Sequence, residues 1–195
     1  DRQTACVSSQ VGCSLSCKFC ATGFMDRKRN LTFDEIYDEA ALLNEMAEKT
    51  YGKKLSNIVF MGMGEPLLNY KNVLKAIERI TAQDGLGMGA RRVTVSTSGI
   101  SKMIRQLGDD GVKFNLALSL HAANDKKRSE IMPINETNNI KSLIDALNYF
   151  YDKTKNDITF EYILFKNEND SLQVADDLIK IYSQLPVHLI NVIEY

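Results

Sequence analysis

The sequence has little proline, no tryptophan, and no cysteine beyond residue 20. Its 195 residues contain three prolines and four cysteines. A disulfide-stabilised secreted domain would spread its cysteines so that the bridges close distant loops. No apolar run approaches the roughly 20 residues that cross a bilayer, and no signal-peptide pattern follows the first residues. These absences argue against a disulfide scaffold and a membrane-spanning protein, and a cytoplasmic location is expected.

An excess of charge of one sign is also lacking. Lys and Arg total 24 and Asp and Glu total 25, which gives a net charge of −1. A dedicated nucleic-acid module usually carries a clear basic excess, so charge alone names no such partner. Short basic runs at residues 27–29, 53–54, 91–92 and 126–128 are interpreted as solvated faces. With 44% hydrophobic residues, the composition is that of one ordinary globular domain.

Short β-branched runs alternate along the chain with longer amphipathic segments. The runs predict strands at residues 4–8, 57–61, 92–96, 114–119, 158–164 and 187–193, and the segments predict helices at residues 32–49, 72–83, 101–107, 140–153 and 170–185. Thr32 and Glu35 form a capping box at the first helix. This alternation indicates a parallel sheet. Six strands are too few for a closed eight-stranded barrel, so a doubly wound open sheet or an incomplete barrel is expected. In either fold, ligands bind at the carboxyl ends of the strands.

The four cysteines lie together at residues 6, 13, 17 and 20. Cys13, Cys17 and Cys20 have C-x3-C-x2-C spacing, which lets three thiolates hold three corners of an iron–sulfur cluster and leaves one iron open to a small molecule. The alternative is a structural zinc site, which prefers four ligands. Cys6 would then be the fourth ligand, although it is seven residues away in a predicted strand. The spacing favours the cluster.

The pattern C-x3-C-x-aromatic-C near the start of a β/α chain resembles the signature of the radical S-adenosylmethionine (SAM) superfamily. Further motifs occur in the order found in its bacterial RlmN-like branch, and the resemblance covers nearly the whole chain. These motifs are residues 6–13, 20–23, 29–32, 61–69, 91–99 and 118–122.

The resemblance implies an α/β fold, a partial (β/α)6 TIM-like barrel of the radical SAM type, with SAM bound at its open top. The implied [4Fe-4S] cluster ligands are Cys13, Cys17 and Cys20. The positions that match SAM-contacting residues are Gly64, Glu65, Ser96, Ser119, Leu120 and His121. Glycine lets the backbone approach a ligand, and a carboxylate suits the methionine ammonium. Taken singly, residues 64–65 are equally a Gly-rich turn, and His121 is more often a structural histidine.

The implied activity is methylation of adenine C2 in 23S rRNA and, in some members, of tRNA. Because this ring carbon is electron-poor, the resemblance implies a radical route through a methylcysteine intermediate on a C-terminal loop. Cys6 matches a second catalytic thiol that enters a transient disulfide bond, whereas from composition alone it is a small buried strand residue. An electron donor such as flavodoxin or ferredoxin is implied, and a monomer is expected.

The sequence departs from the family pattern at both ends. Residues 1–195 are interpreted as a radical SAM core domain without the family's N-terminal RNA-binding domain and C-terminal catalytic loop. Since no cysteine follows Cys20, the methyl-carrying cysteine is absent, and this chain alone is expected not to complete methyl transfer. Residues 27–29, close to the cluster loop, are the best local candidate for RNA contact.

Three alternative functions remain open at this point. A Cfr-like resistance enzyme methylates C8 of the same adenine and shares most motifs. A radical SAM activating enzyme would take hydrogen from a glycine of a partner protein, but it has no need for the additional thiol of Cys6. A zinc-stabilised RNA-binding module without catalysis would contain zinc and no iron or sulfide.

Overall fold

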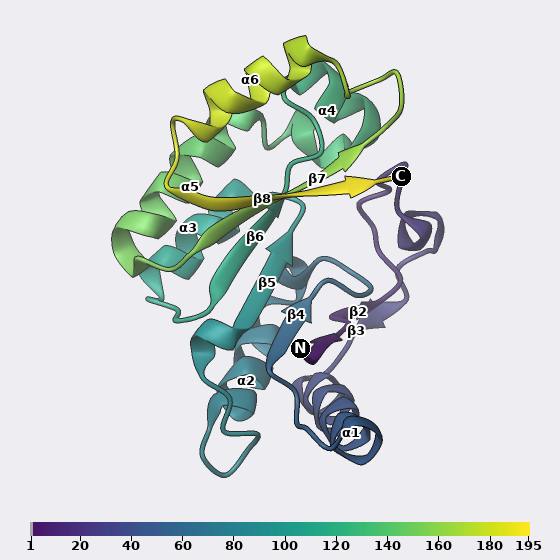
Figure 1. Ribbon diagram of the computed structural model, residues 1–195, viewed down its shortest axis with the longest axis vertical. Helices are drawn as coiled ribbons and strands as arrows, with labels where there is room; N and C mark the ends of the chain where they lie inside the picture. The colour runs from purple at the N-terminus through teal and green to yellow at the C-terminus, as the bar shows by residue number, and fades with distance from the viewer. Residues whose placement is uncertain (1) are drawn as a thin grey trace.

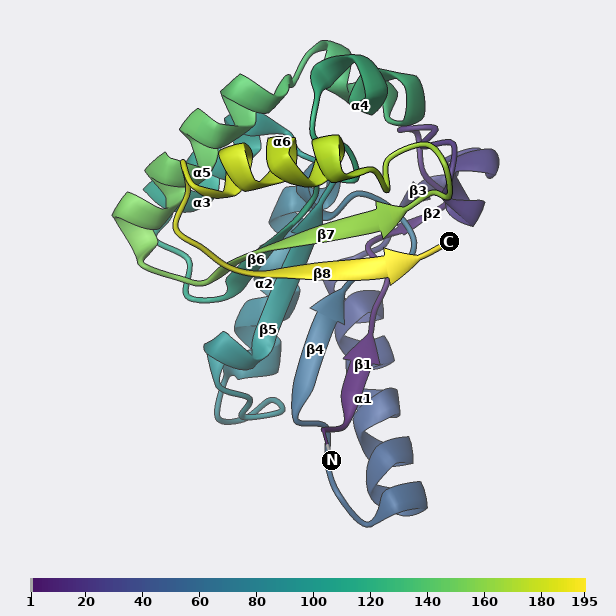
Figure 2. The same cartoon turned by 45° about the horizontal axis from the view of Figure 1, so that its top comes forward.

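The computed structural model describes residues 2–195, within which six parallel strands form one sheet (Figure 1). The strands are β1 (Thr4–Cys6), β4 (Asn57–Phe60), β5 (Val93–Thr97), β6 (Asn115–Ser119), β7 (Ile158–Leu164) and β8 (Val187–Glu194). They are neighbours in the order β1-β4-β5-β6-β7-β8, with every pair parallel. A doubly wound sheet reverses its strand order at a switch point. This sequential order therefore identifies the incomplete barrel, and Figures 1 and 2 show the sheet curling between β1 and β8.

Helices connect the strands and lie on the outer side of the curled sheet (Figure 1). The α-helices are α1 (Phe33–Tyr51), α2 (Tyr70–Thr81), α3 (Ser101–Asp109), α4 (Asp125–Ile131), α5 (Ile140–Thr154) and α6 (Leu172–Tyr182). Short 3₁₀ helices occur at Ala21–Phe24, Pro66–Asn69, Ala90–Arg92 and Pro133–Glu136. Among the described residues, no helix has the length and apolar character needed to cross a membrane.

Strand alternation separates the apolar core from the concave face of the half-barrel. Along β4, Ile58 and Phe60 are buried in the main core, while Asn57 and Val59 are only partly covered. The strand β5 repeats the pattern, with Val93 and Val95 in the same core. Successive side chains of a strand point to opposite faces. The sheet therefore buries one apolar face under the helices and leaves its concave face available for ligands.

Most predicted elements are present, with shifted ends. The capping box is confirmed, because the Glu35 N–H donates to Thr32 Oγ1 at 3.3 Å and the Thr32 N–H donates to Glu35 Oε2 at 2.8 Å. The strand predicted at residues 4–8 ends at Cys6, and the helix predicted at residues 72–83 begins at Tyr70. The helix α4 and the small antiparallel pair of β2 (Gln10–Val11) and β3 (Arg29–Asn30) were not predicted. These pieces are too short for hydrophobic periodicity to identify them.

Candidate active site

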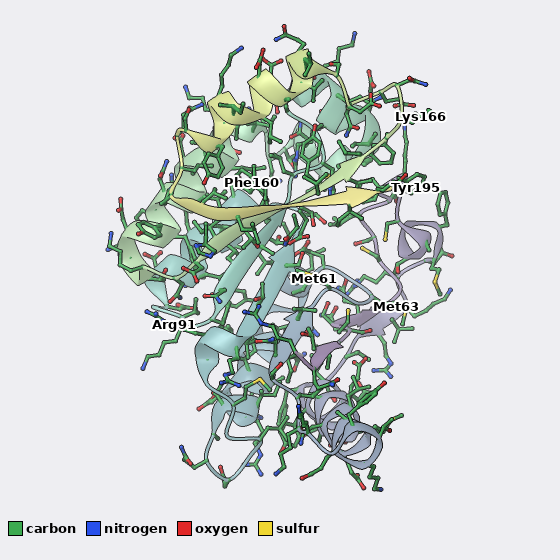
Figure 3. All side chains as sticks on the ribbon, in the orientation of Figure 1. Met61, Met63, Arg91, Phe160, Lys166 and Tyr195 are labelled. Carbon is green, nitrogen blue, oxygen red and sulfur yellow. The ribbon has the colours of Figure 1, made fainter. Side chains whose placement is uncertain are left out.

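A cavity of about 240 Å³ lies where the carboxyl ends of the strands meet the cysteine loop. Its lining comprises Cys13, Cys17, Phe19, Cys20, Thr22, Gly23, Phe60, Met61, Gly62, Gly64, Glu65, Pro66, Ser96, Thr97, Ser98, Ser119, His121, Glu161 and Ile193. Met61, which directly follows β4, is labelled in Figure 3. The fold therefore brings eight of the ten site residues singled out from the sequence to one cavity, at the predicted end of the sheet.

The other two residues, Cys6 and Leu120, do not line this cavity. Leu120 is buried in the main core, and its carbonyl accepts from Arg128 Nε at 3.1 Å. Cys6 is exposed on β1, so its interpretation as a buried strand residue is wrong. Exposed and buried side chains alternate along β1, with Thr4 exposed and Ala5 buried in the core. Cys6 therefore lies on the same face as Thr4, which is the concave face of the sheet. All four cysteines are free thiols within the described chain, so the implied disulfide bond is unsupported.

The cysteine loop is held in place by backbone contacts that need small residues. A Cβ atom at Gly23 would lie 2.5 Å from the Cys17 carbonyl oxygen, so only glycine fits where the loop folds back on itself. The Gly23 N–H donates to the Cys20 carbonyl at 2.8 Å. The Lys18 N–H donates to the Ile131 carbonyl at 3.0 Å, which ties the loop to the end of α4. The three thiols consequently border the cavity from a fixed backbone.

The environment of the thiols fits a cluster better than a single ion. Burial raises the pKa of Cys17 to about 11, and the neighbouring Cys13 and Cys20 add to that shift. Burial also raises the pKa of Cys13. Cationic iron would stabilise the thiolates that this environment disfavours. A cluster takes one thiolate per iron, so its ligands need only border a shared cavity. A structural zinc site prefers four ligands, and Cys6, the fourth ligand considered for zinc, is exposed and does not line this cavity.

The other side of the cavity is acidic. Glu65 is 1% exposed, its Oε1 accepts from the Leu67 N–H at 3.0 Å, and its Oε2 accepts from the Ser98 N–H at 2.7 Å. Burial raises the pKa of Glu65, and this effect outweighs the two backbone hydrogen bonds, which lower it. The lining residues given above include Glu161 as a second carboxylate and no Lys or Arg. A buried carboxylate without a cation favours a positively charged ligand, and the ammonium and sulfonium groups of SAM fit this requirement.

Gly64 positions the acidic side of the cavity. It has a φ of +94°, and a Cβ atom there would lie 2.4 Å from the Gln10 side chain. That side chain is buried, and its Oε1 accepts from the Glu65 N–H at 2.9 Å. Its Nε2 donates to Asn30 Oδ1 at 2.8 Å. Gln10 therefore links the loop after β4 to the hairpin that carries the cysteine motif, and only glycine at position 64 permits this approach.

His121 presents a neutral donor to the cavity. Its Nδ1 accepts from the Ile163 N–H at 3.2 Å, and a neutral imidazole that accepts at Nδ1 carries its proton on Nε2. Its ring stands edge-on to Phe19 with the centroids 4.6 Å apart. Burial, with a further contribution from Arg128, lowers the pKa of His121 to about 3. His121 is therefore both the satisfied histidine that composition favours and a residue of the cavity wall.

This neutral histidine makes stability depend on acid pH. Because the unfolded state takes up a proton near pH 6.5 and the folded state only near pH 3, His121 contributes stability above pH 6.5 that is lost as the pH falls toward 3. We expect the free energy of unfolding to fall by about 1.4 kcal/mol per pH unit from this group. Urea denaturation of the wild type and His121→Asn at several pH values measures it. Asparagine tolerates the positive φ of 56° and can accept from Ile163 without titrating; equal pH slopes in the two proteins would contradict the prediction.

Sequence reasoning missed two ionisable residues at the site. Glu161 lies in β7 beside Ser119 of β6 and accepts from Asn191 Nδ2 at 2.8 Å. A charge inside the apolar run of residues 158–164 was the available signal. The second is Arg128 of α4, which is 0% exposed. Its guanidinium donates to the carbonyls of Ser98, Ser119, Leu120 and Asn138 and to Asn135 Oδ1. Arg128 thus fastens the ends of β5 and β6 to α4 directly behind the cavity.

Comparison with known proteins agrees with this geometry. The family model described as "Radical SAM superfamily" matches residues 7–178. A protein of Cytophaga hutchinsonii named "Probable dual-specificity RNA methyltransferase RlmN" is 59% identical over 195 residues, which are 100% of this chain and 53% of the relative. The chain thus spans about half the length of the curated relatives it matches.

Solved structures show the same fold. The structure of a radical SAM methyltransferase from Sphaerobacter thermophilus is 41% identical, with a TM-score of 0.94 over 98% of this chain and 56% of that chain. Streptococcus suis SuiB bound to S-adenosylmethionine is 17% identical, with a TM-score of 0.69 over 100% of this chain and 41% of that chain, a likeness of fold alone. The chain belongs to the radical SAM superfamily, whose cofactors are a [4Fe-4S] cluster and SAM.

Proposed function

We propose that this chain is the core of a radical SAM methyltransferase that methylates adenine C2 of 23S rRNA, with tRNA as a second substrate. The observation that carries the proposal is the single cavity bordered by Cys13, Cys17 and Cys20 on one side and by Glu65 on the other. The 59% identical relative named as a dual-specificity RNA methyltransferase supports the RNA substrate. Residues 1–195 as one core domain, a monomeric state, and a flavodoxin or ferredoxin as electron donor belong to the same proposal.

The cavity residues have separate roles in this proposal. Cys13, Cys17 and Cys20 hold the cluster, and Glu65 receives the methionine ammonium of SAM through oxygen atoms already oriented by two backbone N–H groups. Ser96, Ser119 and His121, which line the cavity, complete the proposed SAM site. Leu120 belongs to this proposal only through the motif at residues 118–122, because its carbonyl accepts from Arg128 and its N–H donates to the Glu161 carbonyl. Together the two cofactors supply a one-electron route to a ring carbon that does not act as a nucleophile. Cys6 is accessible on the concave face, as a thiol that acts on substrate must be.

Anaerobic reconstitution with iron and sulfide tests the proposal. We expect a reduced four-iron signal in electron paramagnetic resonance that shifts when SAM is added. Glu65→Gln is the informative variant, because it keeps the side-chain shape and removes the charge that faces the ammonium, although it can accept only one of the two N–H bonds from Leu67 and Ser98. It should assemble the cluster and bind SAM at least about tenfold more weakly, a loss of roughly 1.4 kcal/mol. Tight binding of one zinc without cluster assembly would instead support the zinc-stabilised module.

The segment after the cysteine loop is the proposed RNA contact. Phe24 is 80% exposed and Met25 is 50% exposed, and they directly follow Gly23 of the cavity wall. Arg29 is engaged by Glu35 through two contacts of 2.7 Å. Arg27 makes one hydrogen bond of 3.1 Å to Asn30, and Lys28 makes a longer ion pair of 3.9 Å with Asp26, so these two residues are better placed for phosphate. Exposed aromatic rings stack on unpaired bases, and cationic side chains contact the phosphates.

Phe24→Ala is expected to weaken the binding of a short single-stranded RNA that contains an unpaired adenine by about tenfold, since stacking on one base contributes roughly 1–3 kcal/mol. Fluorescence anisotropy with labelled RNA measures the change. Leu42→Ala is the matched control, because Leu42 is also exposed but lies on α1. An equal loss in both variants, or none in Phe24→Ala, would remove Phe24 from the RNA contact.

Methylation at C8 is the alternative within the same chemistry. The residues that line the cavity would serve either ring carbon, because both need the same cofactors. Mass spectrometry of rRNA modified by the full-length enzyme, with the methylated carbon assigned to C2 or C8, distinguishes them. A C8 product would overturn the regiochemistry and leave the cluster and SAM assignments in place.

A further inference from the structure

A second cavity, of about 660 Å³, lies at the opposite end of the half-barrel, where the strands begin. Its lining comprises Arg2, Thr4, Ser56, Asn57, Val59, Arg91, Arg92, Thr94, Asn115, Asp157 and His188. Figure 3 shows Arg91 at this end of the sheet and Tyr195 at the other. None of its residues lines the candidate active site. A cavity of this size is in the range that holds small ligands.

The floor of this second cavity is polar across the whole sheet. Each strand of the main sheet, or the residue directly before it, contributes at least one polar side chain: Thr4, Asn57, Thr94, Asn115, Asp157 and His188. Bulky branched side chains normally fill the interior of a β/α barrel, so packing does not explain a polar row. Asn115 shows the consequence, because its Nδ2 donates to the Arg91 carbonyl at 2.9 Å while its Oδ1 is buried without a partner in the part of the chain that the structure describes. Buried polar atoms are normally paired, so the packing of the fold does not explain this polar side chain.

Positive charge surrounds this floor. Arg2, Arg91 and Arg92 line the cavity, and none of them forms a salt bridge with a carboxylate among residues 2–195. Asp157 is the one acidic residue in the lining. The whole chain has a net charge of −1, so this concentration of arginine is local. It also contrasts with the active-site cavity, whose lining holds two carboxylates and no Arg or Lys.

We propose that this cavity binds the phosphate and ribose of a nucleotide unit. Guanidinium groups bind phosphate through paired N–H donors, which suits Arg91 and Arg92 at the rim. The Asp157 carboxylate is the acceptor in the lining, and ribose hydroxyls are donors that suit it. The unit can come from a free nucleotide or from an RNA strand, because both carry the same phosphate and hydroxyl groups. The proposal uses no residue of the cluster or SAM site and therefore stands independently of the proposed function.

Binding measurements with four probes test the proposal on the unmodified chain: inorganic phosphate, AMP, 2′,3′-dideoxy-AMP and a short single-stranded RNA. AMP should bind about tenfold more tightly than phosphate and than dideoxy-AMP, since only AMP supplies both groups. RNA that binds much more tightly than AMP and displaces it identifies an RNA strand as the source, and RNA that does not displace AMP identifies a free nucleotide. Failure of AMP and RNA to bind, or equal affinity for AMP and dideoxy-AMP, would overturn the assignment.

Variants locate the binding. The double variant Arg91→Gln/Arg92→Gln should weaken binding of AMP by at least about tenfold, because two charge-assisted contacts to phosphate are lost. Arg105→Gln is the matched control, since Arg105 is an exposed arginine on α3 that stacks over Tyr149 outside the cavity. Circular dichroism confirms that each variant is folded. An equal loss of affinity in the control would show non-specific charge attraction and refute the site. Cluster assembly and SAM binding should be unchanged in the double variant, so the two proposals fail separately.

Discussion

Replacing Arg128 with glutamine is expected to lower the free energy of unfolding by roughly 3–5 kcal/mol. The guanidinium is 0% exposed, and it donates to Ser98 O at 2.6 Å, Ser119 O at 3.1 Å, Leu120 O at 3.1 Å, Asn135 Oδ1 at 2.8 Å and Asn138 O at 3.4 Å. Glutamine has two N–H donors and a shorter side chain, so most of these acceptors would lose their partner. Urea denaturation followed by circular dichroism measures the change.

Two companion variants separate the geometry of Arg128 from its charge. Arg105→Gln removes an exposed arginine and should change stability by less than about 0.5 kcal/mol. Arg128→Lys keeps the positive charge but cannot reproduce the planar fork, so it should recover only part of the loss. SAM binding should weaken in both Arg128 variants, because Ser98 and Ser119 line the active-site cavity. If Arg128→Gln were as stable as the control, the guanidinium would not be what holds β5 and β6 to α4.

Arg128 also shows where sequence reasoning reached its limit. The run of residues 126–128 was interpreted as a solvated face, and this interpretation is wrong for Arg128. Lys126 is exposed and Lys127 pairs with Glu168, whereas Arg128 points into the protein from the same helix. The helix α4 has seven residues, DKKRSEI, too few for an apolar stripe to reveal its buried side. Only the tertiary structure shows which of three adjacent basic residues is buried.

The parts of the site that were predicted are those with local signals. The cysteine spacing lies within eight residues, and residues 64–65 lie in the loop that follows the strand predicted at residues 57–61. Glu161 and Ser98 reach the cavity only through the pairing of β5, β6 and β7, which no short motif encodes. Cys6 was misjudged from composition because small thiol side chains are usually buried. The half-barrel leaves its concave face open, so alternation along β1 exposes Cys6 instead.

The fold itself was predictable because six strand patterns alternate with five helix patterns along the chain. What the sequence pattern left open was the choice between a doubly wound sheet and an incomplete barrel. The order of the strands distinguishes these two folds. That order depends on which side of the sheet each crossover helix covers. Here every crossover continues in the same direction, so each strand is added next to the previous one in the main sheet. This sequential order produces the curl that opposes the cysteine loop to Glu161 and Ile193 across one cavity.

Replacing Cys17 with alanine is expected to abolish cluster assembly, whereas replacing Cys6 with alanine should leave it intact. Cys17 is 8% exposed and packs against Ala122, Ile131 and Met132, so alanine fills its place without a clash. The fold should therefore persist while one of three thiolates is lost, and iron bound through only two corners dissociates readily. Iron and sulfide analysis with electron paramagnetic resonance after reconstitution measures the outcome, and thermal unfolding confirms that both variants are folded. A cluster in Cys17→Ala at the wild-type level, or its loss in Cys6→Ala, would show that the ligand set is not Cys13, Cys17 and Cys20. Because Cys17 is buried and lines the cavity, whereas Cys6 is exposed and does not line it, the pair of variants tests the ligand assignment itself and not merely the presence of cysteine.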